Sequence, residues 1–499
     1  MRWRLPGYAA ALSLAALVAL SPVQAGGWSA LGGGPDRTSS VEAGIPAAMA
    51  VKWRTPTMGP VYGGPAVVEG TLYVGSDDGW LYALEASTGQ LIWKFPVLAR
   101  IRAVPAREGS RLFVGAYNGL VYALDAGTGW LLWTFATASW VPASPAVRGD
   151  LVIVSSYDGT VYALDGEDRT LRWSFNPGGD FIPGSPALAG GLVYVASRGG
   201  RIYALDADTG TLQWRQDLPG YSLSGPVIAG GVLYVSGDGR DGGGVFAFDA
   251  RTGEPRWAFK ERGGHWSAPA AGRSLVLVAA RGKVYALDRG KGELKWALEL
   301  PASGGRGPDP RVDDTLVDAP LVEPERAVVP AGEELYVLDL EDGRILYRIR
   351  LPDRVASPLA FYEGALFFGG VDHFIYSLAA IRVYAGDKEV EFPGQPPLMY
   401  EGHLVVPVRP LLEALGFKVE WRKQDRAVIA TRGKRRLWLA PGKETARVSG
   451  REIPAPLPAY LSEGKVLAPL RWLVRAVGGE VTWDPGSLVA RIGYGEVDY

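Results

Sequence analysis

Residues 122–133 read Tyr-Ala-Leu-Asp-Ala-Gly-Thr-Gly-Trp-Leu-Leu-Trp, and this phrase indicates the fold because it recurs along the chain. A second clear copy runs from Tyr82 to Trp93, about forty residues earlier. Apolar, strand-like segments lie between the copies. A repeat of this period that contains strands predicts a β-propeller with one blade per repeat.

Three sets of residues recur with this period and count the blades. Each copy begins with a Pro, at Pro65, Pro105, Pro145, Pro186, Pro226, Pro269, Pro320 and Pro358. The third strand of each copy carries an aromatic residue, at Tyr82, Tyr122, Tyr162, Tyr203, Phe246, Tyr285, Tyr336 and Tyr376. The copies end on Trp93, Trp133, Trp173, Trp214, Trp257, Trp296 and Tyr347. The first two sets have eight members and the third has seven, so the sequence predicts eight blades, one of which takes its outer strand from elsewhere.

The missing outer strand is found before the first copy. The eighth copy runs into Leu378-Ala379-Ala380 and never reaches a Trp, whereas Val51-Lys52-Trp53-Arg54 carries a Trp outside any copy. We therefore expect the N-terminal segment to form the outer strand of the last blade and to close the ring. Closure of this kind removes the two free sheet edges of an open array.

The strands of one blade can be assigned within a single copy. Residues 145–175 predict an inner strand at 145–147, a second at 151–155, a third at 161–165 and an outer strand at 171–175. We expect the closing Trp to pack between adjacent blades. We expect the Asp and the Thr-Gly pair of the phrase to cap the last hairpin.

The phrase Tyr-Ala-Leu-Asp-x-x-Thr-Gly-x-x-x-Trp, present in most copies across residues 50–380, strongly resembles the quinoprotein-type (PQQ-like) propeller repeat. The resemblance implies a mainly β, eight-bladed propeller. It extends to pyrroloquinoline quinone (PQQ)-dependent alcohol and sugar dehydrogenases. It also extends to non-enzymatic members, such as the propeller lipoprotein of the outer-membrane β-barrel assembly machinery. The repeat therefore specifies the fold and leaves the function open.

The sequence does not supply the quinone centre that the resemblance to the dehydrogenases implies. Those enzymes place a vicinal Cys pair over the quinone, and this chain has no Cys. They hold Ca²⁺ through Glu, Asn and Asp, but the only two Asn here, Asn118 and Asn176, stand in a hairpin turn and a blade connection. No Asp can be matched to the family's catalytic base. We expect neither PQQ nor Ca²⁺, with a divergent PQQ-dependent dehydrogenase as the alternative.

The first 25 residues predict a secretory signal peptide. Arg2 and Arg4 precede an apolar run from Tyr8 to Leu20, and Val23-Gln24-Ala25 fits a cleavage site. The run is short for a membrane span, and no Cys follows it to carry a lipid. We expect an exported protein that is not a lipoprotein, with a lead-in at residues 26–49.

Composition excludes several classes of site. The absence of Cys from the 499 residues excludes disulfides, thiolate metal sites and Cys nucleophiles. A net charge of −1 argues against nucleic acid as a partner. A hydrophobic content of 47% in a chain of this length is enough for a large core.

The segments that precede each Pro are expected to line one mouth of the central channel. Five of the eight segments carry an aromatic residue and three carry Arg or His. Such a ring is either a recognition surface for a ligand, or a plug of the channel that packs against the C-terminal domain. The candidates are Tyr62, Arg100, Arg102, Trp140, Phe181, Tyr221, His265, Trp266 and Arg354.

Two insertions interrupt the period. Residues 237–244 lengthen one hairpin and place Asp238 and Asp241 among glycines, which makes a weak Ca²⁺ candidate because the spacing matches no complete loop motif. Residues 302–318 contain four Asp. We expect this second insertion to be an acidic surface loop, with partner binding or a weak cation site as alternatives.

Residues 381–499 predict a second, smaller α+β domain with an internal duplication. Pro407, Arg409 and Trp421 recur 62 residues later as Pro469, Arg471 and Trp483. Each half predicts a strand, a Pro at a helix start, a short helix ended by Gly, and two strands. The phrase Val-Pro-Val-Arg…Leu-Gly-x-x-Val-x-Trp resembles the copper amine oxidase N-terminal-like (stalk) domain. That module implies no oxidase activity, and we expect no copper because the three His are scattered over two domains.

A cluster of basic residues lies in this second domain. It could attract anionic wall polymer or phospholipid headgroups, or it could be an ordinary solvated face. Its members are Arg422, Lys423, Arg426, Arg432, Lys434, Arg435 and Arg436, with Lys418 beside them.

Together these patterns predict an exported, non-enzymatic binding or scaffold protein of the cell envelope. Its propeller would recognise a protein, a peptide or a cell-wall glycan. A hydrolase or lyase is a further alternative, for which His265-Trp266 is the one place to look, because three His offer few bases.

Overall fold

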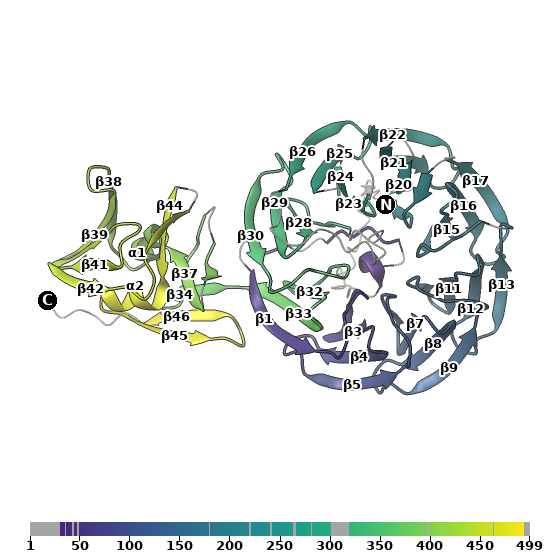
Figure 1. Cartoon of the computed structure of the whole chain (residues 1–499), viewed down its shortest axis with the longest axis horizontal. Coiled ribbons are helices and arrows are strands. Elements are labelled where there is room, and N and C mark those ends of the chain that lie inside the picture. Colours follow the sequence, from purple (N-terminus) through teal and green to yellow (C-terminus); the bar gives the residue numbers. More distant parts are fainter. Residues whose placement is uncertain are drawn as a thin grey trace, which may run out of the picture.

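The computed structural model describes residues 30–493, except residues 35, 42–43, 47–48, 179, 219–220, 240–241, 263–265, 281, 301–318, 394–395, 401 and 463. The signal peptide and the acidic insertion predicted from the sequence lie outside the described residues. A ring of antiparallel sheets forms one part of the molecule, and a smaller unit with two short helices lies beside it (Figure 1). The predicted propeller fold is confirmed.

Each sheet of the ring runs from an inner strand at the channel to an outer strand at the rim (Figure 1). The first four sheets are β2–β5 (Ala66–Val68, Thr71–Gly75, Trp80–Glu85, Leu91–Pro96), β6–β9 (Ala106–Glu108, Arg111–Gly115, Leu120–Asp125, Leu131–Ala136), β10–β13 (Ala146–Arg148, Leu151–Ser155, Val161–Asp165, Leu171–Phe175) and β14–β17 (Ala187–Ala189, Leu192–Ala196, Arg201–Asp206, Leu212–Asp217). The third of these agrees with the strands predicted for residues 145–175.

The other four sheets complete the ring in the described part of the chain. They are β19–β22 (Val227–Ala229, Val232–Gly239, Gly242–Asp249, Pro255–Glu261) with the added strand β18 (Tyr221–Leu223), β23–β26 (Ala270–Ala271, Leu275–Ala280, Lys283–Asp288, Leu294–Glu299), β27–β30 (Leu321–Val322, Arg326–Ala331, Glu334–Asp339, Ile345–Arg350) and β31–β33 (Ala360–Tyr362, Ala365–Gly369, Phe374–Ala380) with β1 (Met49–Pro56). We refer to these eight sheets as blades 1–8 in chain order.

In seven of the eight blades a closing Trp ties the blade to the next one, as predicted; blade 7 ends on Tyr347, whose hydroxyl donates to Pro46 O at 2.6 Å. Each of these indole N–H groups donates to a main-chain carbonyl oxygen in the turn between the third and fourth strands of the neighbouring blade, at 2.9–3.1 Å. The donor and acceptor pairs are Trp53 to Ala86, Trp93 to Ala126, Trp133 to Gly166, Trp173 to Ala207, Trp214 to Ala250, Trp257 to Arg289 and Trp296 to Leu340.

The repeated Asp and Thr organise that same turn. In blade 2 the Oδ1 atom of Asp125 accepts from the Thr128 backbone N–H at 2.8 Å and from its hydroxyl at 2.7 Å. The same pair of bonds joins Asp206 and Thr209 in blade 4. The Asp and the Thr of the phrase therefore cap the last hairpin, as expected.

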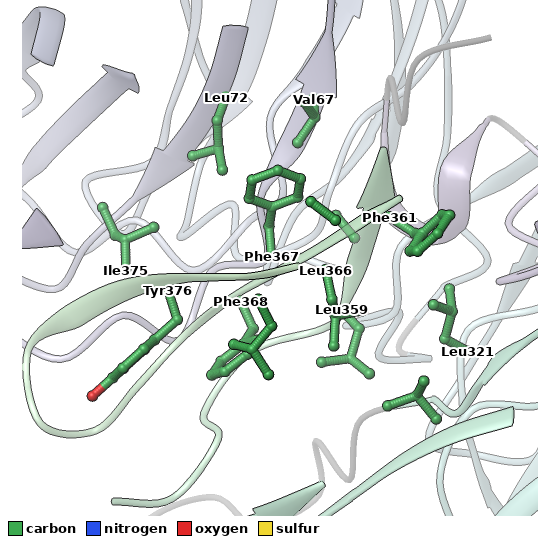
Figure 2. Packing of buried hydrophobic residues seen from close by; sticks show 14 of the residues in the cluster. Val67, Leu72, Leu321, Leu359, Phe361, Leu366, Phe367, Phe368, Ile375 and Tyr376 are labelled. Carbon is green, nitrogen blue, oxygen red and sulfur yellow. The ribbon is translucent and has the colours of Figure 1, made fainter. Parts of the chain in front are cut away.

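The N-terminal strand closes the ring. Strand β1 pairs antiparallel with β33, with Met49 opposite Ala380 and Pro56 opposite Phe374. Blade 8 then packs its second strand between its neighbours: Phe367 and Phe368 lie among Val67 of blade 1 and Leu321 of blade 7 (Figure 2). The closure predicted from the missing Trp is confirmed.

The described residues between Ala30 and Ile45 lie in the central channel, which the sequence did not predict. We call residues 30–45 the channel segment; it begins with the one-turn helix η1 (Leu31–Gly33), seen inside the ring (Figure 1). Its Asp36 and Thr38 carbonyls accept from the Ile228 and Ala271 N–H groups of inner strands. Ser40 then forms a parallel bridge with Val322. The segment therefore passes along the inner strands of blades 5, 6 and 7.

The second unit contains three sheets and two helices in its described residues. The strands are β34 (Arg382–Ala385), β35 (Lys388–Glu389), β36 (Leu398–Tyr400), β37 (His403–Pro407), β38 (Lys418–Arg422), β39 (Ala427–Arg432), β40 (Arg435–Leu439), β41 (Thr445–Val448), β42 (Arg451–Pro454), β43 (Tyr460–Ser462), β44 (Lys465–Pro469), β45 (Glu480–Asp484) and β46 (Val489–Gly493), and the helices are α1 (Val408–Ala414) and α2 (Leu470–Ala476). Each helix follows a Pro, Pro407 or Pro469, as the duplication predicted.

The described helices are all short. None of them has the length and apolar character needed to cross a bilayer.

Candidate ligand-binding mouth of the propeller

Two kinds of connection meet at one end of the ring, which we call the mouth face. The turn between the second and third strands of a blade lies there. The link from the outer strand to the next blade lies there too, because the third strand runs away from this face and the fourth strand runs back to it. Backbone bonds join turn to link: the Tyr117 N–H donates to Arg100 O, the Tyr157 N–H to Trp140 O, and the Arg198 N–H to Phe181 O. Residues from both connections therefore stand side by side.

Four aromatic side chains form a continuous arc on the mouth face. We call Tyr117, Trp140, Tyr157 and Phe181 the aromatic arc. Consecutive ring centroids are 5.4, 5.9 and 4.7 Å apart. Half of the Trp140 surface is exposed to solvent. Rigid aromatic faces of this kind give a large contact area at a low cost in conformational entropy.

A guanidinium group stands at each end of the aromatic arc. Arg102 Cζ lies 5.6 Å from the Tyr117 ring centroid and 4.4 Å from that of Tyr62. Arg198 Cζ lies 5.5 Å from the Phe181 centroid. These are cation–π distances. The arc therefore presents aromatic faces flanked by positive charge.

A cavity of about 230 Å³ opens beside the arc, and we call it the funnel. Its wall includes Tyr62, Arg102, Tyr117, Tyr157 and Arg198, and Trp266 and Asp238 lie across from them. Leu31, Gly32, Arg37 and Ser39 of the channel segment also line it. Because those residues lie within the channel, the channel segment supplies part of the floor of the funnel.

Arg37 is the most deeply buried charge at this floor. It is 8% exposed, and its Nη1 donates to Ser185 O at 2.6 Å and to Pro226 O at 3.3 Å. Burial lowers the pKa of its guanidinium to about 10, so the group remains a cation at neutral pH.

Arg102 is fixed differently, because it has a carboxylate partner. Its Nε and Nη2 donate to the two carboxylate oxygens of Asp77 at 3.1 and 2.7 Å. Burial alone would lower the pKa of Arg102, but the bonds to Asp77 and its charge raise it above the usual value. The forked pair holds the guanidinium 4.4 Å from the Tyr62 ring centroid.

The predicted mouth residues occupy different places. Tyr62, Arg102 and Trp266 line the funnel, and Trp140 and Phe181 belong to the aromatic arc. Arg100 is on the mouth face with a largely exposed side chain 3.9 Å from Asp77. Tyr221 instead packs edge-on against Phe246, at 5.0 Å between centroids, and Arg354 stands beside the Val355–Gly370 bridge, so neither lines the funnel. His265 lies outside the described residues.

The sequence reasoning missed Tyr117, Tyr157, Arg198 and Arg37. The first three occupy the turns between second and third strands, shortly before the Gly of each turn. A signal was available, since those turns lie on the same face as the links that were considered. Arg37 belongs to no repeat and gave no signal.

The weak metal candidates gain no further ligands. Asp238 lies on the long hairpin of β20 and β21, and its Oδ1 accepts from the backbone N–H of Trp266 at 3.1 Å. Asp241 lies outside the described residues. Within the residues that are described, no group of three or more His, Asp or Glu side chains is placed to hold a metal ion.

The basic residues of the second unit are partly engaged in structural contacts. Arg432 Nη1 donates to Leu415 O at 2.8 Å and Arg435 Nη1 donates to Val477 O, so each cation caps the C-terminal end of a helix. Arg422 pairs with Asp425 at 3.2 Å. Lys423, Arg426, Lys434 and Arg436 are exposed.

The ring of antiparallel sheets, with a Trp of seven blades bonded to the next blade, defines the class of PQQ-like β-propellers. Residues 37–110, 100–180 and 171–323 match the family model described as outer membrane protein assembly factor BamB, and together these stretches exceed half of the chain. The chain belongs to this family. Residues 384–492 match the copper amine oxidase N-terminal domain, as the duplicated phrase predicted.

Several solved structures share the fold. BamB from Moraxella catarrhalis is 20% identical, with a TM-score of 0.56 over 66% of this chain and 98% of that one. A europium-containing methanol dehydrogenase is 14% identical, with a TM-score of 0.57 over 72% and 98%. The quinohemoprotein alcohol dehydrogenase ADHIIG from Pseudomonas putida HK5 is 14% identical, with a TM-score of 0.59 over 76% and 84%. No curated protein sequence matches the chain.

Proposed function

We propose that the chain is an exported, non-enzymatic binding protein of the cell envelope, whose mouth face recognises a protein, a peptide or a glycan. The aromatic arc carries this proposal. It spans the turns of blades 2 and 3 and the links that follow them, with ring centroids less than 6 Å apart, and half of Trp140 is exposed beside a cavity. Aromatic faces of this type stack on sugar rings or on apolar and proline side chains.

The donors around the funnel fit a Ca²⁺-bound quinone poorly. Ca²⁺ takes six to eight oxygen ligands, mostly carboxylates and carbonyls. Among the described residues that line the funnel, Asp238 is the only carboxylate, and its Oδ1 already accepts from a backbone N–H. The dehydrogenase relatives share the fold at 14% identity, which carries no cofactor with it. We therefore assign no redox step to the funnel.

The envelope location in this proposal has two supports. The family model describes an outer membrane assembly factor. The N-terminal sequence has the charge and apolar pattern of a signal peptide without a lipid-attachment Cys.

The test compares two exposed Trp residues. Mature protein, the Trp140→Ala variant and the Trp130→Ala variant are applied to peptide and glycan arrays. Trp130 is 75% exposed and stands just before the outer strand of blade 2, away from the arc, so it is the matched control. We expect ligands whose binding falls at least about tenfold in Trp140→Ala, the order of a lost aromatic anchor, and is kept in Trp130→Ala.

A second assay addresses the enzyme alternative. Reduction of an artificial electron acceptor by mature protein supplied with PQQ, Ca²⁺ and an alcohol or sugar would overturn the proposal. An array on which no ligand depends on Trp140 would also overturn it.

A further inference from the structure

Arg37 is a buried cation without an acidic partner among the described residues. No carboxylate of the described chain lies within ion-pair distance of it, and its bonds run to two main-chain carbonyls only. Its Nε atom has no hydrogen-bond partner. A guanidinium carries five N–H donors, so most of its bonding capacity is unused.

An arrangement of this kind is unfavourable unless something compensates it. Removing a charge from water is costly in free energy, and carbonyl dipoles offset only part of that cost. The backbone adds a second cost, because Arg37 has φ 63°, in the left-handed region that Arg seldom adopts. Strain and uncompensated charge in one residue point to a binding role.

The propeller is shaped around this side chain. A Cβ atom added to Gly225 would lie 2.2 Å from Arg37 Nη1, so only glycine leaves room for the guanidinium there. The contacts of Nη1 with Ser185 O and Pro226 O then hold the group between blades 4 and 5. The cation is therefore held in place at the floor of the funnel.

The other charges around the funnel do not neutralise Arg37. Arg102 is already paired with Asp77, and Arg198 is a second cation at the rim, so neither supplies a negative charge to Arg37. The Oδ1 of Asp238 is committed to the Trp266 N–H, and the Asp36 carboxylate interacts with backbone N–H groups of its own turn. Among the described residues that line the funnel, Asp238 is the only acidic one.

We propose that the funnel takes a ligand that bears a carboxylate or phosphate group, and that Arg37 binds this group. The inference rests on the recognition function proposed above and names the chemistry of its ligand. The guanidinium offers its Nη2 group, which no described protein group bonds, to an oxyanion, while Nη1 stays on its two carbonyls. The rest of the ligand lies along the aromatic arc, beginning at Tyr157 and Tyr117.

The experiment uses aromatic probes that differ only in the charged group. Benzoate, phenyl phosphate and the neutral amide benzamide are titrated calorimetrically into mature full-length protein. We expect both anions to bind at least tenfold more tightly than benzamide. Equal affinities of benzoate and benzamide would overturn the anion site; if Trp140→Ala weakened both equally, recognition at the mouth would still stand.

Three variants assign the preference to Arg37. Arg37→Met removes the charge and should abolish the preference for benzoate over benzamide. Arg37→Lys keeps a cation without the fork and should keep part of the preference. Arg169→Met is the matched control, because Arg169 is exposed in a turn and has φ 64°. An unchanged preference in Arg37→Met would contradict the proposal.

A second measurement is independent of whether the Arg37 variants fold. Crystals of the unmodified protein soaked with 4-bromobenzoate locate the bromine by its anomalous scattering. A carboxylate within hydrogen-bond distance of Arg37 supports the site. Bromine found only at other places in the crystal would mean binding at crystal concentration only, and this result would overturn the proposed site.

Discussion

At the scale of single residues, the repeated phrase is explained by one contact between blades. The Gly of the Thr-Gly pair lies under the Trp ring of the preceding blade: a Cβ atom on Gly129 would stand 2.6 Å from Trp93 ring atoms. The Trp in turn donates to Ala126 O in the same turn. The Trp and the Gly therefore recur together in most blades; in blade 3 Arg169, with φ 64°, takes the place of the Gly.

This contact predicts a large cost for Gly129→Ala. Gly129 has φ 72°, so alanine costs about 1–2 kcal/mol for the left-handed backbone and about 1–3 kcal/mol for displacing the Trp93 ring. Gly149→Ala is the matched control, because Gly149 has φ 59° but a Cβ atom added there would meet nothing within 4 Å. Urea unfolding should show a loss of about 2–5 kcal/mol for Gly129→Ala and only the backbone share for Gly149→Ala. Equal losses would contradict the contact.

At the scale of elements, the turns between third and fourth strands make stability depend on pH. Hydrogen bonds from Thr128 lower the pKa of Asp125, those from Thr209 lower the pKa of Asp206, and a bond from Arg256 lowers the pKa of Asp249 to about 2. A folded-state pKa below the unfolded value means that the unfolded chain binds more protons in acid. This contribution is therefore complete above the unfolded pKa of about 4 and is lost as pH falls toward 2.

We predict that Asp249→Asn reduces this acid sensitivity. Urea midpoints measured at pH 5, 4, 3 and 2.5 should fall less steeply for the variant than for the unmodified protein, because one titrating turn has been removed. At pH 5 the variant should be the less stable of the two. Parallel curves across the acid range would contradict the assignment to the turn.

The channel segment is a second element whose attachment can be tested. Glu323, 4% exposed, accepts from the Ile45 N–H at 2.5 Å, and Arg326 donates to Ile45 O. Glu323→Ala removes a bond to a charged acceptor, worth about 1.5–3 kcal/mol. The Ile45 and Val41 amides should then exchange hydrogen roughly ten- to a hundredfold faster. Glu325→Ala, at an exposed neighbour, is the control, and unchanged exchange in Glu323→Ala would contradict the attachment.

The elements also show what the sequence could predict. Blade strands were predictable because each repeated residue makes the same contact in most blades, so the sequence period reflects the packing between blades. The helix starts at Pro407 and Pro469 were predictable for the same reason. The channel segment has no period, and its bonds reach residues 148 or more positions away in sequence, as in Arg37 with Ser185 and Ile45 with Arg326. Such contacts leave no local pattern.

The candidate site was predictable only in part for a related reason. Tyr62, Arg102, Trp140, Phe181 and Trp266 were found by their place before the repeated Pro. Tyr117 and Tyr157 were missed although they share the mouth face, since only one of the two connections was considered. The forked bond of Arg102 to Asp77 joins one link to a turn of the preceding blade, and residue spacing alone does not reveal it.

At the scale of the whole molecule, two features stabilise the seam of the ring, which is the place where blade 8 meets blade 1. Strand β1 covers the edge of β33, and Trp53 spans the seam to reach Ala86 of blade 1. The second unit then packs on the same region, where Ala50 meets Ile381 and Leu488 in one apolar cluster. The C-terminal unit therefore lies against the strand that closes the propeller (Figure 1).

Closure by β1 predicts that two nearby truncations differ sharply. A chain that starts at residue 46 lacks the channel segment but keeps β1, and it should stay folded and elute as the unmodified protein does. A chain that starts at residue 57 also lacks β1, so the edge of β33 and the Phe367 ring that contacts Trp53 are uncovered. Unpaired edges of this kind promote association between chains. We expect the shorter chain to elute as higher oligomers in size-exclusion chromatography and to unfold at lower urea with a broader transition. If both truncated chains unfolded at the same urea concentration, β1 would contribute nothing to the stability of the ring. Contacts between neighbouring blades alone would then hold the ring closed.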